Sequence, residues 1–437
     1  MKRINNSVLV LSLFAGLMYT SAQEKKQLSL DEAVQLGIQN SKSLKIDAAK
    51  IEEATADLLA AKNQQLPDLS VSASYLYLPV KPTIDLKIPG VSTAGGPEVH
   101  QVAYGSANVT MPIYSGGRIK YGIQSAKYLV EASKLSTEND KVAIAYNVAQ
   151  AYNNLFKANQ SIKVLEENLS ASQKRDETFL KLENNGVIAR NDRLKANLQT
   201  SNIELQLLEA QNNYNIANIN MDLLLGLPDN TEIEVDQQYI NEADDVKTVD
   251  FYLNEARENR KDLQALDQQR KAAELGTRSA KAENLPSIAF TGGYVAADIP
   301  KFLTIYNAVN VGVGVSYNLS NLWKENSALK QSKAREMQLS ATNELMNDNI
   351  KLEVNREYQN SDYSKKRIAV FEKAAVQANE NYRITKNKYD NGLATMTELL
   401  DADAAQIAAN VGVINAKADA ALAYRKLLQT TGTLTIK

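Results

Sequence analysis

The chain has 437 residues, with 49 basic and 51 acidic side chains and a formal net charge of −2. Without a positive field to attract phosphate groups, nucleic acid is not an expected partner. The chain contains no cysteine, which excludes disulfides, thiolate metal sites, cysteine nucleophiles and a lipoprotein anchor on cysteine. A single histidine, His100, and the absence of a Gly-x-Ser-x-Gly motif argue against an enzyme.

The N-terminus has the pattern of a secretory signal peptide. Lys2 and Arg3 precede an apolar run at 8–18, and small residues follow it up to Ala22. The run is too short to span a bilayer as a helix. We therefore expect cleavage near Ala22 and an exported chain that contacts a membrane only through strands or an amphipathic surface.

The exported chain begins with a capping box. Ser29 and Glu32 are spaced so that their side chains bind backbone N–H groups at the start of a helix. We expect this helix to run to about residue 64 and to stop before Pro67. A matching helix is expected at about 251–284, before Pro286.

After each of these prolines, the apolar period changes from helical to two. Strands are predicted at about 68–78, 102–114, 287–297 and 307–319. The alternation is strictest in the last of them, where apolar residues occupy every second position: Val309, Val311, Val313, Val315, Tyr317 and Leu319. Small or polar residues such as Asn310 and Ser316 lie between them. Each strand should thus have one apolar and one polar face.

Two long stretches, 118–183 and 324–389, carry apolar residues at steps of three, four or seven, which is typical of coiled-coil-like helices. At 1.5 Å per residue, a helix of about 65 residues would be roughly 100 Å long, so each must lie against other long helices. Both stretches end at an Asn-Gly turn, where glycine suits a left-handed cap. The chain should then return in helices ending at Leu225 and Gln429.

The same elements occur twice. Asn391-Gly392 follows Asn185-Gly186 at an offset of 206 residues (391 minus 185), which is far longer than a solenoid period and indicates two copies of one large unit. The predicted organisation is a signal peptide at 1–22, repeat 1 at 23–228, an acidic and solvated linker at 229–250, and repeat 2 at 251–437, with hairpin tips near 185–192 and 391–398.

In their order and spacing, these features resemble the outer membrane efflux protein family typified by TolC. The resemblance covers essentially the whole exported chain. It is carried by the Leu-Pro step that ends each first helix, the Pro-Ile-Tyr-Ser-Gly-Gly run at 112–117, the Asn-Gly turns, the tandem repeat, and the segment 392–402 at the second tip.

The resemblance implies an α+β membrane protein of a Gram-negative bacterium. Three identical chains would each give four strands to a shared β-barrel in the outer membrane and long helical hairpins to a periplasmic tunnel. Closure by several chains also follows from physics, because strand edges cannot stay unpaired in lipid and four strands are too few to enclose a lumen. The implied function is the exit duct of a multi-component efflux or secretion system, without enzymatic activity or a cofactor. Its partners would be a periplasmic adaptor (membrane fusion) protein, an inner-membrane pump and outer membrane lipid.

The resemblance also implies roles for residues at the hairpin tips. Glu398 and Asp401 lie one helical turn apart and would form the pore constriction; the alternative is two solvated acids near a helix N-terminus. Asp192 and Tyr389 would form a tip latch. The family's tip arginine is replaced here by Ala394, and Arg190 is the candidate substitute.

Two further groups complete the expected sites. The turn residues would dock the adaptor: Asn185, Gly186, Asn391 and Gly392. Aromatic residues at the strand ends, Tyr114, Tyr317 and Trp323, would form a membrane-interface belt or else pack at the junction of strand and helix.

Two other classes of protein stay open from the residues alone. A secreted coiled-coil filament or spacer would share the long helices, but it would not need strands of period two. An outer-membrane enzyme is disfavoured by the single histidine and by the missing nucleophile motif.

Overall fold

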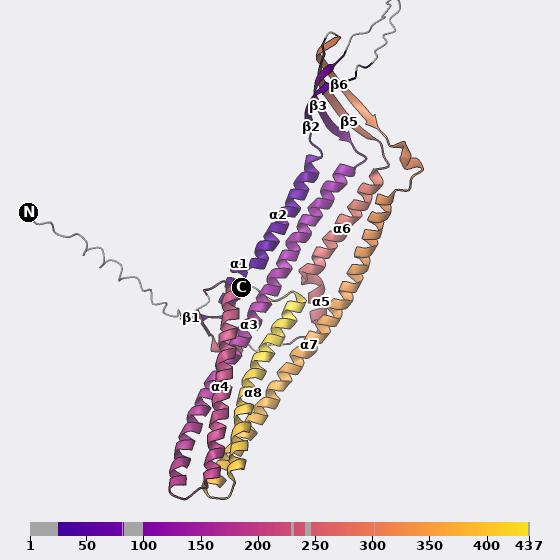
Figure 1. Cartoon of the computed structure of the whole chain (residues 1–437). Helices are drawn as coiled ribbons and strands as arrows, with labels where there is room; N and C mark the ends of the chain where they lie inside the picture. The colour runs from indigo at the N-terminus through magenta and orange to yellow at the C-terminus, as the bar shows by residue number, and fades with distance from the viewer. Residues whose placement is uncertain are drawn as a thin grey trace, which may run out of the picture. The chain divides into compact units, whose positions relative to one another are not determined.

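The computed structural model describes residues 25–80, 82, 99–228, 231–240, 246–300 and 302–435 (Figure 1). The expected signal peptide and most of the proline-rich loop after the first strand lie outside the described residues. The chain forms two compact units, and each combines segments from both sequence repeats. Unit 1 comprises Met1–Lys45, Glu138–Arg260 and Asn349–Lys437, and unit 2 comprises Ile46–Thr137 and Lys261–Asp348.

Helices account for most of the described residues. They are α1 (Leu30–Asn40), α2 (Lys42–Asn63), α3 (Arg118–Asn184), α4 (Arg190–Leu225), α5 (Val249–Asn259), α6 (Lys261–Ala282), α7 (Ser327–Asp390) and α8 (Met396–Thr431). The long helices α3 and α7 each continue through an Asn-Gly turn into α4 and α8, which gives hairpin 1 (α3 and α4) and hairpin 2 (α7 and α8) (Figure 1). The capping box of Ser29 and Glu32 is present at the start of α1, as predicted.

The first helix of each repeat is broken into two, where the sequence predicted one. The first break is at Ser41, whose backbone is extended and whose hydroxyl accepts a hydrogen bond from the Leu44 N–H at 3.2 Å. A serine that binds its own downstream backbone competes with the helix and starts a new one. The second break is at Arg260, whose guanidinium binds Glu353 at 2.8 Å and the Thr430 carbonyl at 3.3 Å.

Unit 2 contains a four-stranded antiparallel sheet in the order β2-β3-β5-β6. Its strands are β2 (Asp68–Tyr77), β3 (Gln101–Tyr114), β5 (Ser287–Ile299) and β6 (Leu303–Ser316). β6 ends before the predicted 319, because residues 319–322 form the 3-10 turn η2 (Leu319–Leu322). The apolar alternation therefore predicted the end of the strand three residues too late (319 minus 316).

The register of the sheet aligns residues of one kind on one face. Val71 lies opposite Ala107, Ala107 opposite Tyr294, and Tyr294 opposite Val309. The neighbouring row on the other face runs from Ser70 through Asn108 and Gly293 to Asn310. Because a strand's side chains alternate between faces, this register keeps apolar and polar side chains on opposite faces along these two rows, up to the β-bulge between Val295 and Ala297.

The predicted linker between the repeats is in part a strand, and its description as solvated is wrong for that part. β4 (Glu232–Val235) pairs in parallel with β1 (Lys25–Leu28), and the 3-10 turn η1 (Gln237–Ile240) follows it. Ile233 and Tyr239 are buried in the core of unit 1. Glu232 and Glu234 alternate with Ile233 and Val235, so these two acids occupy the outer face of a short strand.

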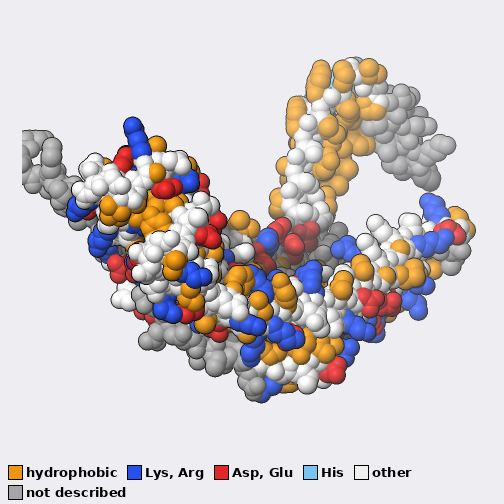
Figure 2. All heavy atoms as spheres, turned by 90° about the horizontal axis from the view of Figure 1, so that it is seen from below, with side chains coloured by type: hydrophobic (Ala, Val, Ile, Leu, Met, Phe, Trp, Pro, Cys, Tyr) orange, Lys and Arg blue, Asp and Glu red, His pale blue; other side chains and the backbone are white. Residues whose placement is uncertain are grey.

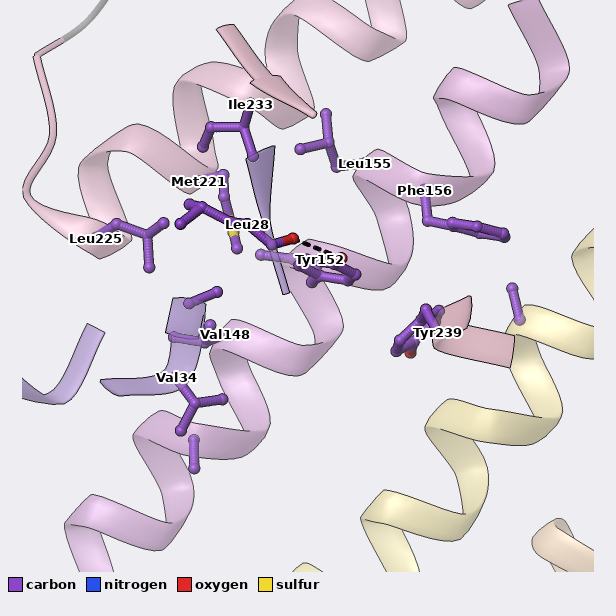
Figure 3. Packing of buried hydrophobic residues seen from close by; sticks show 14 of the residues in the cluster. Leu28, Val34, Val148, Tyr152, Leu155, Phe156, Met221, Leu225, Ile233 and Tyr239 are labelled. Atoms are coloured by element: carbon purple, nitrogen blue, oxygen red, sulfur yellow. Dashed lines mark hydrogen bonds between the residues drawn. The ribbon is translucent and has the colours of Figure 1, made fainter. Parts of the chain in front are cut away.

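The core of unit 1 gathers around Tyr152 of α3 (Figure 3). Its hydroxyl donates to the Leu28 carbonyl at 2.9 Å and accepts from the Asp236 N–H at 2.6 Å, which ties β1 and the end of β4 to α3. Burial raises the pKa of Tyr152 to about 12. Asn218 of α4 holds the same segment by accepting from the Ile233 N–H at 2.9 Å. These contacts anchor the base of both helices of hairpin 1.

Candidate functional site

Two tight turns form the tips of the hairpins. Gly186 and Gly392 have φ angles of 73° and 71°, the left-handed conformation that glycine adopts without steric cost. The N–H of the next residue closes each turn, Val187 to the Leu182 carbonyl and Leu393 to the Lys388 carbonyl. The Asn-Gly pairs, including Asn185 and Asn391, are exposed at these turns.

The acid pair begins α8, directly after the second turn. Thr395 is the N-cap, and its N–H and hydroxyl donate to Glu398 Oε2 at 2.6 and 2.9 Å, while the Glu398 N–H donates back to the hydroxyl at 3.3 Å. These hydrogen bonds to the carboxylate hold the pKa of Glu398 below its ordinary value of 4.5. Asp401 follows one turn later, also exposed. The Thr-x-x-Glu spacing of this capping box is visible in the sequence, although the box was not predicted from it.

Hairpin 1 lacks this arrangement at the equivalent place. Its N-cap is Ala189, which makes no side-chain cap, and Asp192 instead forms an ion pair with Lys195 at 3.3 Å. The two tips are therefore chemically different, since only the second carries a capped carboxylate with a second acid one turn away.

Of the expected latch residues, Tyr389 and Asp192 lie near each other. The Tyr389 ring packs edge-on against Phe179, with ring centroids 5.8 Å apart. Burial raises the pKa of the Tyr389 hydroxyl, and the charge of Asp192 raises it further. Within the described part of the chain, no hydrogen bond joins Tyr389 to Asp192. Arg190 is exposed at the first residue of α4.

The polar contacts that Arg175 makes between the hairpins were not predicted. Arg175 of α3 donates to Asp403 of α8 at 2.7 Å, to the Tyr382 hydroxyl of α7 at 3.2 Å and to the Ser172 hydroxyl at 3.4 Å. Ser172 in turn lies 2.8 Å from the Thr200 hydroxyl of α4. No local pattern marks these residues, because each reads as an ordinary polar position on a long helix.

A second ion pair stays within hairpin 1. Arg193 of α4 pairs with Glu183 of α3, and both side chains are about one-fifth exposed. At the repeat-equivalent positions, 206 residues later, hairpin 2 has Leu399 and Tyr389, which join the apolar cluster of the tips. Near the tips, the side chains at these equivalent positions therefore make different contacts: an ion pair in hairpin 1 and apolar packing in hairpin 2.

The aromatic residues at the strand ends are largely open to solvent in unit 2. Tyr114 follows a register shift at the end of β3, and it is 46% exposed. Tyr317 is 41% and Trp323 70% exposed. Exposure on this scale does not support the packing alternative for Trp323.

No helix of the described residues combines the length and the apolar character that a membrane-spanning helix needs. No group of three or more histidine, aspartate or glutamate side chains in the same residues is arranged to hold a metal ion.

Comparisons with known proteins identify the family. The sequence profile described as "Outer membrane efflux protein" matches residues 33–227 and 252–433. No curated protein matches the chain. Among solved structures, the fold is similar to VceC of Vibrio cholerae, with a TM-score of 0.77 and 19% identity over 92% of this chain and 96% of VceC.

Two outer membrane channels also have a similar fold. The CmeC outer membrane channel of Campylobacter jejuni has a TM-score of 0.75 and 18% identity over 93% of this chain and 86% of CmeC. The MtrE outer membrane channel of Neisseria gonorrhoeae, solved in its open state, has a TM-score of 0.72 and 16% identity over 93% of this chain and 89% of MtrE. Because the family profile matches both repeats over most of their length, the chain belongs to the outer membrane efflux protein family.

Proposed function

We propose that three copies of this chain close one β-barrel in the outer membrane and that the hairpin tips gate the periplasmic end of the resulting duct. Its family makes the chain an outer-membrane efflux channel and not an enzyme, which removes the filament alternative.

The edges of the sheet carry the argument for several chains. Within the described residues, β2 pairs only with β3, and β6 pairs only with β5. Unpaired edge N–H and C=O groups each cost several kcal/mol in hydrocarbon, so a membrane sheet must close on itself. Four strands cannot do so, since the smallest membrane barrels have about eight. Strands from other copies are the natural partners for both edges.

The two faces of the sheet suit lipid and water respectively. The apolar face is open in unit 2, with Val311 71% and Val71 76% exposed. Hydrophobic side chains gather there with few charged ones (Figure 2). The opposite face holds a polar row, in which Ser72 and Ser106 share a hydrogen bond of 2.9 Å. We assign the first face to lipid and the second to the lumen.

The hairpins of unit 1 also present apolar surface that the chain does not cover. On α4 the exposed apolar residues follow a helical period: Leu194, Leu198, Leu205, Leu208, Ile216, Ile219 and Leu223. Exposed apolar residues of α7 include Leu352, Tyr363 and Val370. Stripes of this kind rarely stay in water, and neighbouring copies in a tunnel would cover them.

We assign ion selection to Glu398 and Asp401. In a trimer, three copies of the pair would face one narrow opening, and a ring of carboxylates favours cations. The capping box supports this role because it keeps the Glu398 carboxylate charged and fixes its direction. Asp192, Tyr389 and Arg190 would contribute to the closed arrangement of the tips.

Docking of the periplasmic adaptor is assigned to the two turns. Asn185, Gly186, Asn391 and Gly392 are exposed there, and Leu393 beside them is 77% exposed. An exposed apolar side chain beside an exposed turn suits a helical partner that brings apolar contacts. An inner-membrane pump would supply the energy.

The test combines mass and conductance. The detergent-extracted protein should have the mass of a trimer by light scattering corrected for detergent, and it should form cation-selective channels in planar bilayers. A well-folded monomer with an intact strand signal in circular dichroism would contradict the closure of the barrel by several chains.

A further inference from the structure

Both Asn-Gly pairs of the sequence lie at the hairpin tips, directly after the last residue of a long helix. Asn185-Gly186 follows α3, and Asn391-Gly392 follows α7. In such a pair, the backbone nitrogen of the glycine can attack the side-chain amide of the asparagine before it, because glycine has no Cβ to obstruct the approach. Each turn can therefore undergo a spontaneous change that needs no enzyme, metal or oxidant.

The reaction is a deamidation, and water is its only other reactant. The glycine nitrogen forms a bond to Cγ of the asparagine, its proton leaves with the amide NH₂ as ammonia, and a cyclic imide remains. Water then opens the imide at either of its C–N bonds within the ring. Opening at Cγ gives aspartate, and opening at the backbone carbonyl gives isoaspartate, in which the chain continues through the former side chain. Either product has a carboxylate in place of a neutral amide.

The glycines of the two turns offer the same conditions for this reaction. Beyond the adjoining residues, no atom lies within 4 Å of the position that a Cβ would occupy at Gly186 or at Gly392, so both turns have room for the ring. The Gly186 N–H donates to the Glu183 carbonyl and the Gly392 N–H to the Tyr389 carbonyl, each at 2.9 Å. This bond must break before the nitrogen can attack, and it does so at the same cost in both turns.

The asparagine side chains distinguish the two turns. Asn391 Nδ2 donates to the Asn387 carbonyl at 2.7 Å, which ties the amide to the last turn of α7. The hydrogen bond opposes the rotation that brings Cγ over the glycine nitrogen, and this adds to the barrier of the reaction. In the part of the chain that the structure describes, the Asn185 side chain makes no hydrogen bond. Both asparagines are exposed, so water reaches either one.

The residues that precede the asparagines also differ in charge. A neutral residue, Asn184, precedes Asn185. Asp390 precedes Asn391, and it is an exposed acid that pairs with Lys386 at 2.9 Å. The attacking nitrogen becomes negative when it loses its proton, so a neighbouring carboxylate disfavours the attack at the second tip. Solvent and the pairing with Lys386 weaken this effect, which leaves the hydrogen bond of Asn391 as the larger difference.

We infer that Asn185 is a site of spontaneous modification in the folded protein and that the fold protects Asn391 from the same reaction. The first tip thus gains a negative charge as the protein ages, whereas the second tip keeps its amide. The inference does not depend on the proposed channel, because the chemistry takes place within one turn. Where the first turn docks the adaptor as proposed, the new carboxylate lies in the docking surface, so that an aged tip differs in charge from a new one.

The test uses Asp390→Asn, which gives both tips the sequence Asn-Asn-Gly. An exposed ion pair contributes little to stability, so the variant should fold. The detergent-extracted variant is kept in mildly alkaline buffer, either folded or unfolded in urea, and mass spectrometry of its peptides follows the deamidation of each tip. In the folded protein, Asn185 should react about threefold faster than Asn391 or more, a ratio that one hydrogen bond can set. In urea the two rates should be equal, because neither side chain then has a fixed partner.

Equal rates in the folded variant, or a faster reaction at Asn391, overturn the inference. A product at the first tip that persists in Asn185→Gln belongs to Asn184 and overturns it as well, since the longer glutamine side chain closes the ring far more slowly. If Asp390→Asn does not fold, the wild type supplies the test. Its ratio of the two rates should fall on transfer from the folded state to urea, and an unchanged ratio contradicts the inference. Absence of channels in planar bilayers would contradict only the proposed function.

Discussion

Thr395 and Glu398 bind each other reciprocally at the start of α8. The threonine N–H and hydroxyl donate to one carboxylate oxygen, and the glutamate N–H donates to the threonine hydroxyl. One carboxylate thus has two separable properties: it caps a helix, and it carries a charge at the proposed constriction. Substitutions can remove either property alone.

Glu398→Gln should abolish the charge and keep the cap, because glutamine also serves at the third position of a capping box. Thr395→Val should keep the charge and weaken the cap. Loss of the N-cap hydroxyl should destabilise the protein by about 1 kcal/mol. We expect cation selectivity, measured as reversal potential under a salt gradient, to fall in Glu398→Gln and to persist in Thr395→Val. The opposite ranking would assign Glu398 to the cap alone.

The pH dependence of selectivity should follow the lowered pKa of Glu398. A carboxylate whose pKa is depressed in the folded protein stays ionised as the pH falls to 4.5, the ordinary pKa of a glutamate. Its charge is lost only below that pH. In an Asp401→Asn background, selectivity should therefore survive down to pH 4.5 and disappear below it. Thr395→Val in the same background should move this loss to somewhat higher pH, since the hydroxyl that donates to the carboxylate is gone while the backbone N–H of residue 395 still donates to it. The check is a titration of reversal potential.

Substitution of both Glu398 and Asp401 tests the proposed ring of carboxylates. Glu398→Ala with Asp401→Ala should reduce cation selectivity and abolish block by multivalent cations added from the periplasmic side, because a narrow ring of carboxylates binds such ions. Glu380→Gln is the control, since Glu380 is an exposed acid of α7 that pairs with Arg383. Unchanged selectivity and block in the double variant would return both acids to the solvated outside of the tip.

The face assignment of the sheet predicts a contrast between neighbouring residues of β6. Val313→Arg should destabilise the protein in lipid by about 2–4 kcal/mol if the residue lies near the middle of the bilayer. Asn310→Arg, on the opposite face, should insert normally and alter conductance. Urea unfolding from lipid vesicles gives the first quantity, and single-channel recording gives the second. Equal insertion of both variants would contradict the assignment.

Removal of the Tyr152 hydroxyl, which links β1 and the end of β4 to α3, should destabilise the protein. Tyr152→Phe leaves the Leu28 carbonyl and the Asp236 N–H without their shared partner in a buried site. The free energy of unfolding of the extracted protein should fall by about 1–3 kcal/mol. Tyr363→Phe, at an exposed tyrosine of α7, should change it by less than about 0.5 kcal/mol. A similar loss in both would show that the hydroxyl of Tyr152 has no special role.

The sequence by itself determined the features whose contacts lie within about one turn or one strand pair. The Ser29 capping box, the left-handed glycines at 186 and 392 and the two-residue period of Val309 to Val315 all depend on neighbours a few positions away. Such contacts form whenever the local backbone adopts the favoured geometry. The capping box of Thr395 and Glu398 also depends on residues only three positions apart, so it could have been predicted from the sequence.

Only the tertiary structure decided which distant surfaces meet. Ile233 lies in an acidic segment whose strand partner is some 200 residues earlier at 25–28, and Arg175 and Asp403 are 228 positions apart. A charged side chain on a long helix has the same kind of sequence neighbours whether it is solvated or forms an ion pair. Its role changes when a second helix approaches and removes the water, because burial makes the partner obligatory.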